Sequence, residues 1–170
     1  METLHACRDV TADEELLLSY ILTSLTRRER QAQLAGKFGF VCCCAVCSLT
    51  GAAARGSDMR QSKLARLDDA VYVAVASREF EWGLQLVNET LGLHRAEGLD
   101  DPPGLARCTY DAYQACRNAG RHQQALEWLE KARDANVQAE GLDAESSLRF
   151  ARMLRLPTNA PHDPCLGDEP

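Results

Sequence analysis

The chain is organised around the stretch Phe38-Gly39-Phe40-Val41-Cys42-Cys43-Cys44-Ala45-Val46-Cys47, which holds half of its eight cysteines. Three of these cysteines, Cys42, Cys44 and Cys47, have the spacing C-x-C-x2-C. Short thiolate side chains at this spacing can converge on one soft cation, and tetrahedral Zn²⁺ takes four such ligands. Adjacent residues of an extended chain point to opposite sides, so we expect Cys43 to face away. The spacing therefore predicts a zinc site with three ligands from this run and a fourth from elsewhere.

Two other interpretations of these cysteines stay open. Free cysteine packs like a small hydrophobic residue, so the run is also compatible with a strand of buried, inert thiols. A disulfide is the second alternative. No framework spacing links the remaining cysteines, and no apolar signal segment opens the chain. We therefore expect the protein in the cytosol or nucleus, where thiols stay reduced and clustered cysteines more commonly bind metal.

Composition and charge limit the partners of the chain. Its 170 residues are 45% hydrophobic, enough for one domain, or a small one plus an extension. Residues 1–62 hold 7 Lys/Arg and 7 Asp/Glu, whereas residues 63–170 hold 12 Lys/Arg and 18 Asp/Glu and so carry the whole net charge of −6. An acidic second part argues against binding to a nucleic-acid backbone, and no apolar run approaches the ~18–20 residues of a membrane span. We expect neither DNA nor a membrane as a direct partner.

The residues before the cysteines predict a strand and a short helix. Residues 15–21 form a mostly apolar run of strand length, typical of a buried strand, with Tyr20 near its end. Thr26 and Glu29 have the spacing of a capping box, and good helix formers follow as far as Gly36, which fits a helix stop. This helix carries three arginines, Arg27, Arg28 and Arg30. We expect them to form a solvated face, and anion binding is the alternative.

The predicted strand, the short helix and the cysteine run, taken in this order, resemble the C-terminal end of a SET domain. They are most similar to the SET–MYND type of protein-lysine methyltransferase and its fungal relatives. The resemblance covers residues 6–48, about a quarter of the chain. It is carried by Arg8-Asp9-Val10, Glu15-Leu16-Leu17-Leu18-Ser19-Tyr20, Thr26-Arg27, Arg30-Gln31, Leu34, Phe38, Phe40, Cys42, Cys44 and Cys47.

The resemblance implies a role for each matching residue of the site. Tyr20 matches the catalytic tyrosine whose hydroxyl lines the lysine channel and orients the amine. Phe40 matches an aromatic residue beside the adenine of S-adenosylmethionine, and Phe38 stands where many relatives have tyrosine. Zn²⁺ and S-adenosylmethionine are the implied cofactors, and a protein with a lysine side chain, a histone among the candidates, is the implied substrate. The implied zinc ligands are Cys42, Cys44 and Cys47.

The chain departs from the family in its cofactor-binding motifs. The Gly-rich segment and the N-H-x-C-x-P-N segment that hold the cofactor are missing, and the sequence contains no Asn-His pair. The fourth zinc ligand of the family comes from that second segment. We therefore expect the chain to be the C-terminal part of a SET protein and to be inactive alone. Taken without the cysteines, Tyr20 is better explained as a core tyrosine with a satisfied hydroxyl.

The second part of the chain predicts helices. Residues 48–57 combine glycines with three alanines and favour a linker, after which Asp58 is placed to cap a helix. Apolar residues then recur every three or four positions in five segments. These segments begin near residues 58, 80, 105, 123 and 143, the last one capped by Asp143.

A faint internal repeat relates two of these helices. Residues 80, 83, 87 and 90 align with residues 122, 125, 129 and 132 at a constant offset of 42, with small residues at the second and fourth places. Small residues let paired helices approach closely, so the pattern resembles helical hairpins of the tetratricopeptide type, which the SET–MYND family also carries at its C-terminus. Generic antiparallel helix packing is the alternative.

Together these features predict a mainly α fold with four parts. Residues 1–37 are the end of a SET domain with a short β segment, residues 38–57 a cysteine-rich segment and linker, residues 58–156 tetratricopeptide-like antiparallel hairpins, and residues 157–170 a disordered tail. The predicted function is that of a methyltransferase fragment. A non-catalytic, zinc-stapled interaction module is the alternative, and a free-standing zinc protein is a third hypothesis.

Overall fold

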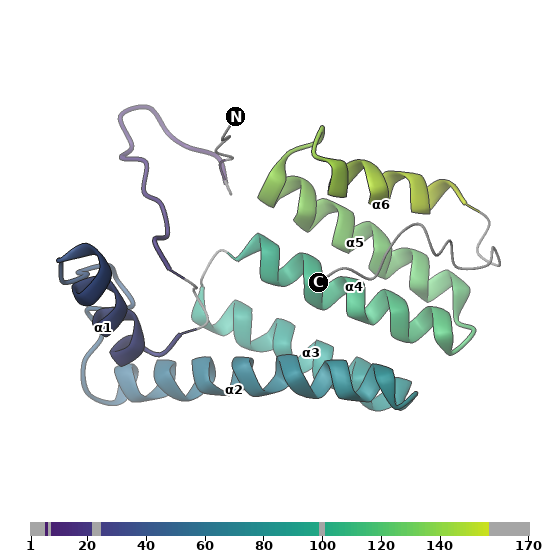
Figure 1. Ribbon diagram of the computed structural model, residues 1–170, viewed down its shortest axis with the longest axis horizontal. Coiled ribbons are helices and arrows are strands. Elements are labelled where there is room, and N and C mark those ends of the chain that lie inside the picture. The colour runs from purple at the N-terminus through teal and green to yellow at the C-terminus, as the bar shows by residue number, and fades with distance from the viewer. Residues whose placement is uncertain (1–5, 7, 22–24, 99–100, 157–170) are drawn as a thin grey trace.

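All regular elements in the described part of the chain are helices. The computed structural model describes residues 6, 8–21, 25–98 and 101–156. Its helices are α1 (Arg27–Phe38), α2 (Gly51–Ala76), α3 (Phe80–Glu97), α4 (Pro102–Asn118), α5 (His122–Glu140) and α6 (Glu145–Arg155) (Figure 1). The prediction of a mainly α fold is confirmed. The predicted tail at residues 157–170 lies outside the described residues.

The segment before α1 differs from its prediction. Residues 15–21 form no strand, and the side chains of Leu16 and Leu17 lie in solvent, so the buried strand predicted here is wrong for this structure. A strand needs a neighbour to pair its backbone groups, and none of the described residues offers one. Figure 1 shows this N-terminal segment arching away from the helices.

Helix α1 begins as predicted and ends later. The Thr26 N–H donates to Glu29 Oε2 at 2.8 Å, and the Glu29 N–H donates to Thr26 Oγ1 at 3.4 Å, which completes the capping box. Gly36 is an ordinary helical residue. The helix ends where Gly39 adopts a left-handed φ of 73° and donates its N–H to the Ala35 carbonyl, a conformation that glycine reaches at little cost.

Helix α2 starts seven residues before the predicted cap at Asp58. The linker prediction is therefore wrong for residues 51–57. Alanine is the best helix former, and tertiary contacts hold this first part of the helix against α3. Ser57 Oγ donates to Glu97 Oε2 at 2.6 Å, and Gln61 Nε2 donates to the same oxygen at 3.2 Å.

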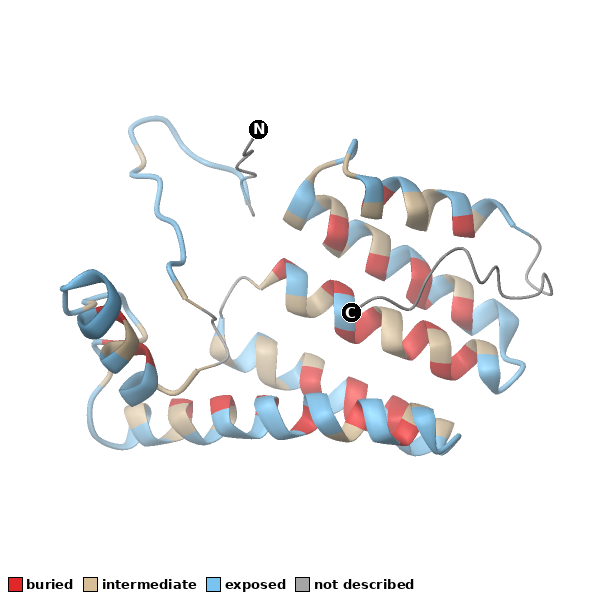
Figure 2. Ribbon diagram, in the orientation of Figure 1, coloured by how far each residue is buried: buried red, intermediate tan, exposed pale blue. Residues whose placement is uncertain are grey.

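Helices α2 to α6 pack in chain order, each mainly against the next, and lie side by side in Figure 1. Their buried residues lie on the facing sides, as Figure 2 shows. Helix α1 lies beside the start of α2 and contributes nothing to this main core. Its buried members include Leu67, Val71, Leu84, Val87, Tyr113, Cys116, Trp128 and Leu129.

The turns that join α2 to α3 and α4 to α5 have the same backbone. Arg78 and Gly120 sit at equivalent places in these turns and both have positive φ, 61° and 75°. The next residue of each turn, Glu79 or Arg121, donates its N–H to the carbonyl five positions earlier at 2.8 Å. The two hairpins therefore repeat in backbone geometry as well as in sequence.

The helix that follows each turn also buries the same positions. Each aligned pair after the first is buried in both copies: Gly83 and Ala125, Val87 and Leu129, Thr90 and Ala132. A Cβ added at Gly83 would lie 3.6 Å from the Ala74 Cβ, an ordinary van der Waals contact, so α3 passes close to the end of α2 here. The offset of 42 exceeds the roughly 34 residues of tetratricopeptide repeats, and that assignment stays a prediction.

Helices α4 and α6 begin differently from one another. Helix α4 starts at Pro102, three residues before the predicted position near residue 105. Asp101 accepts the Gly104 N–H at 3.2 Å, and two prolines occupy the first turn, where no N–H is needed. Helix α6 follows Ala144 without a side-chain cap, so the predicted cap at Asp143 is wrong. None of the described helices combines the length and apolar character that a membrane crossing requires.

Candidate metal centre

The three predicted ligands converge. The Sγ atoms of Cys42, Cys44 and Cys47 lie within 4.8 Å of one another. Zinc at about 2.3 Å from each sulfur would set them about 3.8 Å apart, so a small closure suffices. Thiolates are the donors that zinc prefers. The residues that the structure describes add no fourth ligand to this group.

The four cysteines of the run differ in how far they are buried. Cys47 is buried and Cys42 half-buried, whereas Cys43 and Cys44 are exposed. Cys43 stays outside the group of three sulfurs, as the alternation predicts. The alternative of a buried apolar strand is wrong, because the run contains no strand and two of its thiols face solvent. No disulfide joins any of the cysteines in the described ranges.

The sulfurs differ in acidity. Burial alone would raise the pKa of Cys44, but the Cys47 N–H, 3.4 Å from its sulfur, and the thiols of Cys42 and Cys47 favour its thiolate, so the pKa is lowered. At Cys42 the Cys44 N–H favours the thiolate, but partial burial and the neighbouring thiols outweigh it, and the pKa is raised. Cys44 is therefore readier to ionise than Cys42, and the thiolate is the form that binds metal.

Side chains of helix α1 hold residues 42–47, the cysteine segment, through hydrogen bonds to the backbone of this segment. Gln31 Nε2 donates to the Cys42 carbonyl at 2.7 Å, and the Cys42 N–H donates to Gln31 Oε1 at 3.0 Å. Arg27 Nε donates to the Cys47 carbonyl at 2.7 Å. Sequence reasoning missed both contacts, although Arg27 and Gln31 stand four residues apart and so share one helix face.

The arginines of α1 are not uniformly solvated. Arg28 is exposed, but Arg30 is only 7% exposed, so the prediction of a solvated face is wrong there. Its Nη1 donates to the Leu25 carbonyl, while Nη2 is buried and has no hydrogen-bond partner among the residues that the structure describes. The aliphatic part of an arginine can lie along an apolar surface, which explains how a charged residue shares a face with the buried Leu34.

An aromatic cluster of Tyr20, Phe38 and Phe40 precedes the cysteines. The Tyr20 ring meets the rings of Phe38 and Phe40 edge-on, with centroids 5.2 and 5.6 Å apart. Tyr20 therefore lies close to the start of the cysteine segment, although the two are far apart in the chain. It is 60% exposed, so the alternative of a buried core tyrosine is wrong.

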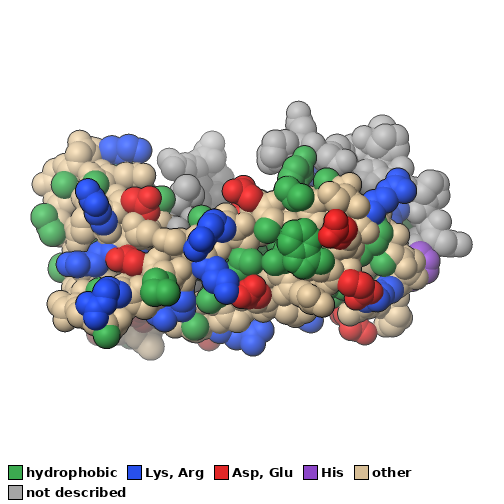
Figure 3. Space-filling view, turned by 90° about the horizontal axis from the view of Figure 1, so that it is seen from below, with side chains coloured by type: hydrophobic (Ala, Val, Ile, Leu, Met, Phe, Trp, Pro, Cys, Tyr) green, Lys and Arg blue, Asp and Glu red, His purple; other side chains and the backbone are tan. Residues whose placement is uncertain are grey.

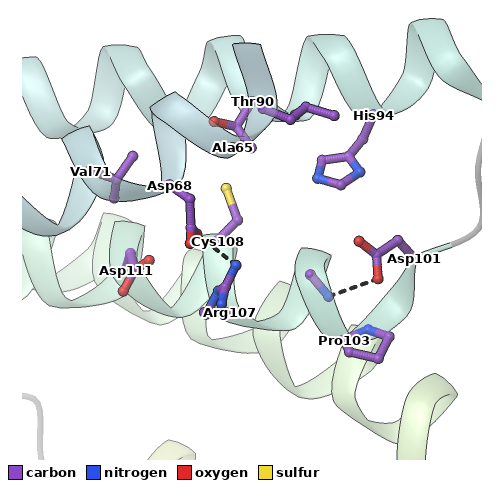
Figure 4. Close-up of a pocket in the computed structure, with 12 residues that line it drawn as sticks. Ala65, Asp68, Val71, Thr90, His94, Asp101, Pro103, Arg107, Cys108 and Asp111 are labelled. Carbon is purple, nitrogen blue, oxygen red and sulfur yellow. Dashed lines mark hydrogen bonds and ion pairs between the residues drawn. The ribbon is translucent and has the colours of Figure 1, made fainter. Parts of the chain in front are cut away.

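A separate pocket of about 360 Å³ lies among α2, α3 and α4 (Figure 4). Arg107 forms an ion pair with Asp68 at 2.7 Å on one side, and the His94 ring lies on the other. Burial lowers the pKa of His94, although the Asp101 charge opposes this. Burial and the Asp68 charge raise the pKa of Asp111 to about 6. The pocket shares no residue with the cysteine site.

The outer surface carries charges of both signs. Figure 3 shows basic and acidic side chains interspersed over the face seen from below, with hydrophobic side chains gathered between them. Exposed hydrophobic residues of α2 include Met59, Tyr72 and Val73.

The site and fold together define a helical protein with a cysteine-rich candidate metal centre. No family model matches the chain. It is 30% identical over 162 residues to the histone-lysine N-methyltransferase set5 of Schizosaccharomyces pombe, an alignment that covers 91% of this chain and 48% of that protein. The chain thus spans about half the length of the curated relative it matches. This similarity supports a SET-related protein.

Proposed function

We propose that the chain is the C-terminal part of a SET-domain protein-lysine N-methyltransferase that uses S-adenosylmethionine. The observation that carries the proposal is the convergence of three sulfurs directly after an aromatic cluster that includes Tyr20. The motif order alone resembles the close of a SET domain, and the similarity to a histone-lysine methyltransferase extends over most of the chain.

Each residue of the site has a distinct role in this proposal. Cys42, Cys44 and Cys47 hold zinc, which acts as a structural cross-link rather than in the chemistry. Their fourth partner comes from outside the described residues. Tyr20 orients the amine of the substrate lysine, and Phe40 packs beside the adenine of the cofactor, which supplies the methyl group. Positioning and electrostatics are the main contributions a protein makes to such a transfer.

The substrate in this proposal is a protein lysine, and the name of the relative makes a histone the first candidate. A nuclear or cytoplasmic location follows from that substrate. Direct DNA binding is not part of the proposal, because the charge of the second part is negative.

Zinc content tests the metal centre. Native mass spectrometry of the purified chain should find one zinc per molecule, and Cys44→Ser should remove it. Cys43→Ser is the matched control, because Cys43 is exposed and lies outside the group of sulfurs. It should leave the zinc content unchanged. A metal-free wild-type chain, or equal zinc in both variants, contradicts the proposed centre.

A methyl-transfer assay tests the catalytic part of the proposal. We expect the 170-residue chain with labelled S-adenosylmethionine and histone to give no turnover, because it lacks the Gly-rich and Asn-His motifs. Turnover that is lost in Tyr20→Phe would confirm the role of Tyr20 and refute the inactivity of the chain alone.

The repeated hairpin favours a second candidate, a non-catalytic interaction module stapled by zinc. Helical repeats stack into extended surfaces that bind protein segments. The full transcript separates the two candidates. An upstream Gly-rich segment with an N-H-x-C motif favours the methyltransferase, and its absence favours the module.

A further inference from the structure

We propose that Gln31 and Arg27 are positioning residues of the metal centre, which set the backbone of the cysteine segment so that its sulfurs converge before metal binds. The inference rests on the proposed zinc site and assigns part of its metal affinity to two side chains of α1. Neither side chain offers a thiolate, imidazole or carboxylate to the ion. Both act through hydrogen bonds to the cysteine backbone.

Gln31 fixes the first ligand. Its side-chain amide bonds both the N–H and the carbonyl of Cys42, at 3.0 and 2.7 Å. Two bonds to one residue restrain the rotation of its backbone as well as its place. Because the Cα–Cβ direction follows the backbone, the Cys42 sulfur is aimed by an amide that does not touch it.

Arg27 fixes the last ligand, one helical turn away. Four residues of α-helix advance about 6 Å, so the two side chains reach out from α1 at well-separated points. The later helical residue, Gln31, holds the earlier cysteine, and Arg27 holds Cys47. The cysteine segment therefore runs back along α1 and is tied at both its ends.

The start of α1 is itself anchored. The Arg27 N–H donates to Asp58 Oδ1 of α2 at 2.7 Å, and the Thr26–Glu29 capping box secures the same turn. Asp58 thereby supplies a partner for an N–H that the helix leaves unbonded. The cysteine segment is thus linked through α1 to the long helix α2.

A site held in this way loses less conformational freedom when metal arrives. Groups behind metal ligands typically contribute 10- to 100-fold to affinity. We expect Gln31→Ala to weaken metal binding by roughly that factor. We expect Gln31→Glu to weaken it at least as much, because a carboxylate keeps the acceptor for the Cys42 N–H but turns an oxygen toward the Cys42 carbonyl.

Cobalt binding tests the inference without any assay of activity. The purified chain is titrated with Co²⁺, and the thiolate-to-metal absorbance gives the dissociation constant. Gln33→Ala is the matched control, because it removes the same side chain from the same helix without a hydrogen bond to the cysteine segment. We expect wild type and the control to agree and Gln31→Ala to bind roughly 10- to 100-fold more weakly. Circular dichroism of the metal-free proteins should be the same for all three.

A second pair of variants separates hydrogen bonding from charge. Arg27→Gln keeps a donor for the Cys47 carbonyl, whereas Arg27→Ala removes it, so the first should retain more affinity. Equal affinities of wild type and Gln31→Ala would overturn the positioning role while leaving the zinc site intact. Failure of the wild-type chain to bind Co²⁺ would instead overturn the metal centre, and the inference with it.

Discussion

Arg78 and Gly120 occupy the same place in two successive helical hairpins and share a left-handed backbone, with φ of 61° and 75°. Each donates its N–H to the carbonyl three positions earlier, at 3.1 and 3.0 Å. Gly120 adopts this conformation without steric cost, whereas the side chain of Arg78 makes the same conformation strained.

This difference predicts opposite effects on stability. We expect Arg78→Gly to raise the free energy of unfolding by roughly 0.5 kcal/mol, because relief of strain exceeds the added freedom of the unfolded chain. Gly120→Ala should lower it by about 1 kcal/mol, although no atom of the described residues lies within 4 Å of the added Cβ. Urea unfolding measures both values.

Gly92→Ala is the control for these turns. Within the described part of the chain its added Cβ also meets nothing within 4 Å, but Gly92 lies inside α3 with ordinary helical geometry. Here the Gly→Ala exchange should raise the free energy of unfolding by roughly 0.5–1 kcal/mol. Equal effects of the two Gly→Ala exchanges would show that backbone conformation does not govern them.

Glu97 joins the start of α2 to the end of α3. Its side chain is 2% exposed and accepts hydrogen bonds from Ser57, Arg60 and Gln61. Glu97→Ala should lower the free energy of unfolding by roughly 3 kcal/mol, because it leaves buried donors and a charge without their partner. Glu89→Ala removes an ion pair whose acid is 42% exposed and should cost less than about 1 kcal/mol. Similar losses in the two variants would refute the role of burial.

Asp111 predicts a pH-dependent stability. Its pKa is raised from 3.8 to about 6, so between these values the folded protein binds more protons than the unfolded chain. Stability should therefore fall as pH rises from 4 to about 7. Asp111→Asn removes this dependence and should gain on the order of 2 kcal/mol over wild type at pH 7 but little at pH 4. Parallel pH profiles of the two proteins would contradict the assignment.

Removal of metal should act locally. The main core lies in α2 to α6 and contains no residue of the cysteine segment. A chelator should therefore speed proteolysis at residues 41–50 but leave the helical circular dichroism and the main unfolding transition nearly unchanged. The Cys44→Ser protein should show no response to the chelator. Loss of helicity on chelation would mean that the metal supports the whole fold.

Local signals predicted much of this molecule. The capping box at Thr26 and Glu29 and the apolar faces of the later helices depend on residues near one another in the chain. The C-x-C-x2-C spacing belongs to the same group, because short spacing alone keeps Cys42, Cys44 and Cys47 within reach of one another.

Long-range contacts decided the rest. Helix α2 starts at Gly51 because Glu97 holds its first turns, and Asp58 serves α1 rather than its own helix. The apolar run at residues 15–21 forms no strand, because strand pairing depends on a neighbour that local sequence cannot supply. The sequence by itself determined which cysteines come together. Only the tertiary structure decided that Gln31 and Arg27 aim them, because a hydrogen bond across 11 or 20 residues requires the chain to turn back on itself.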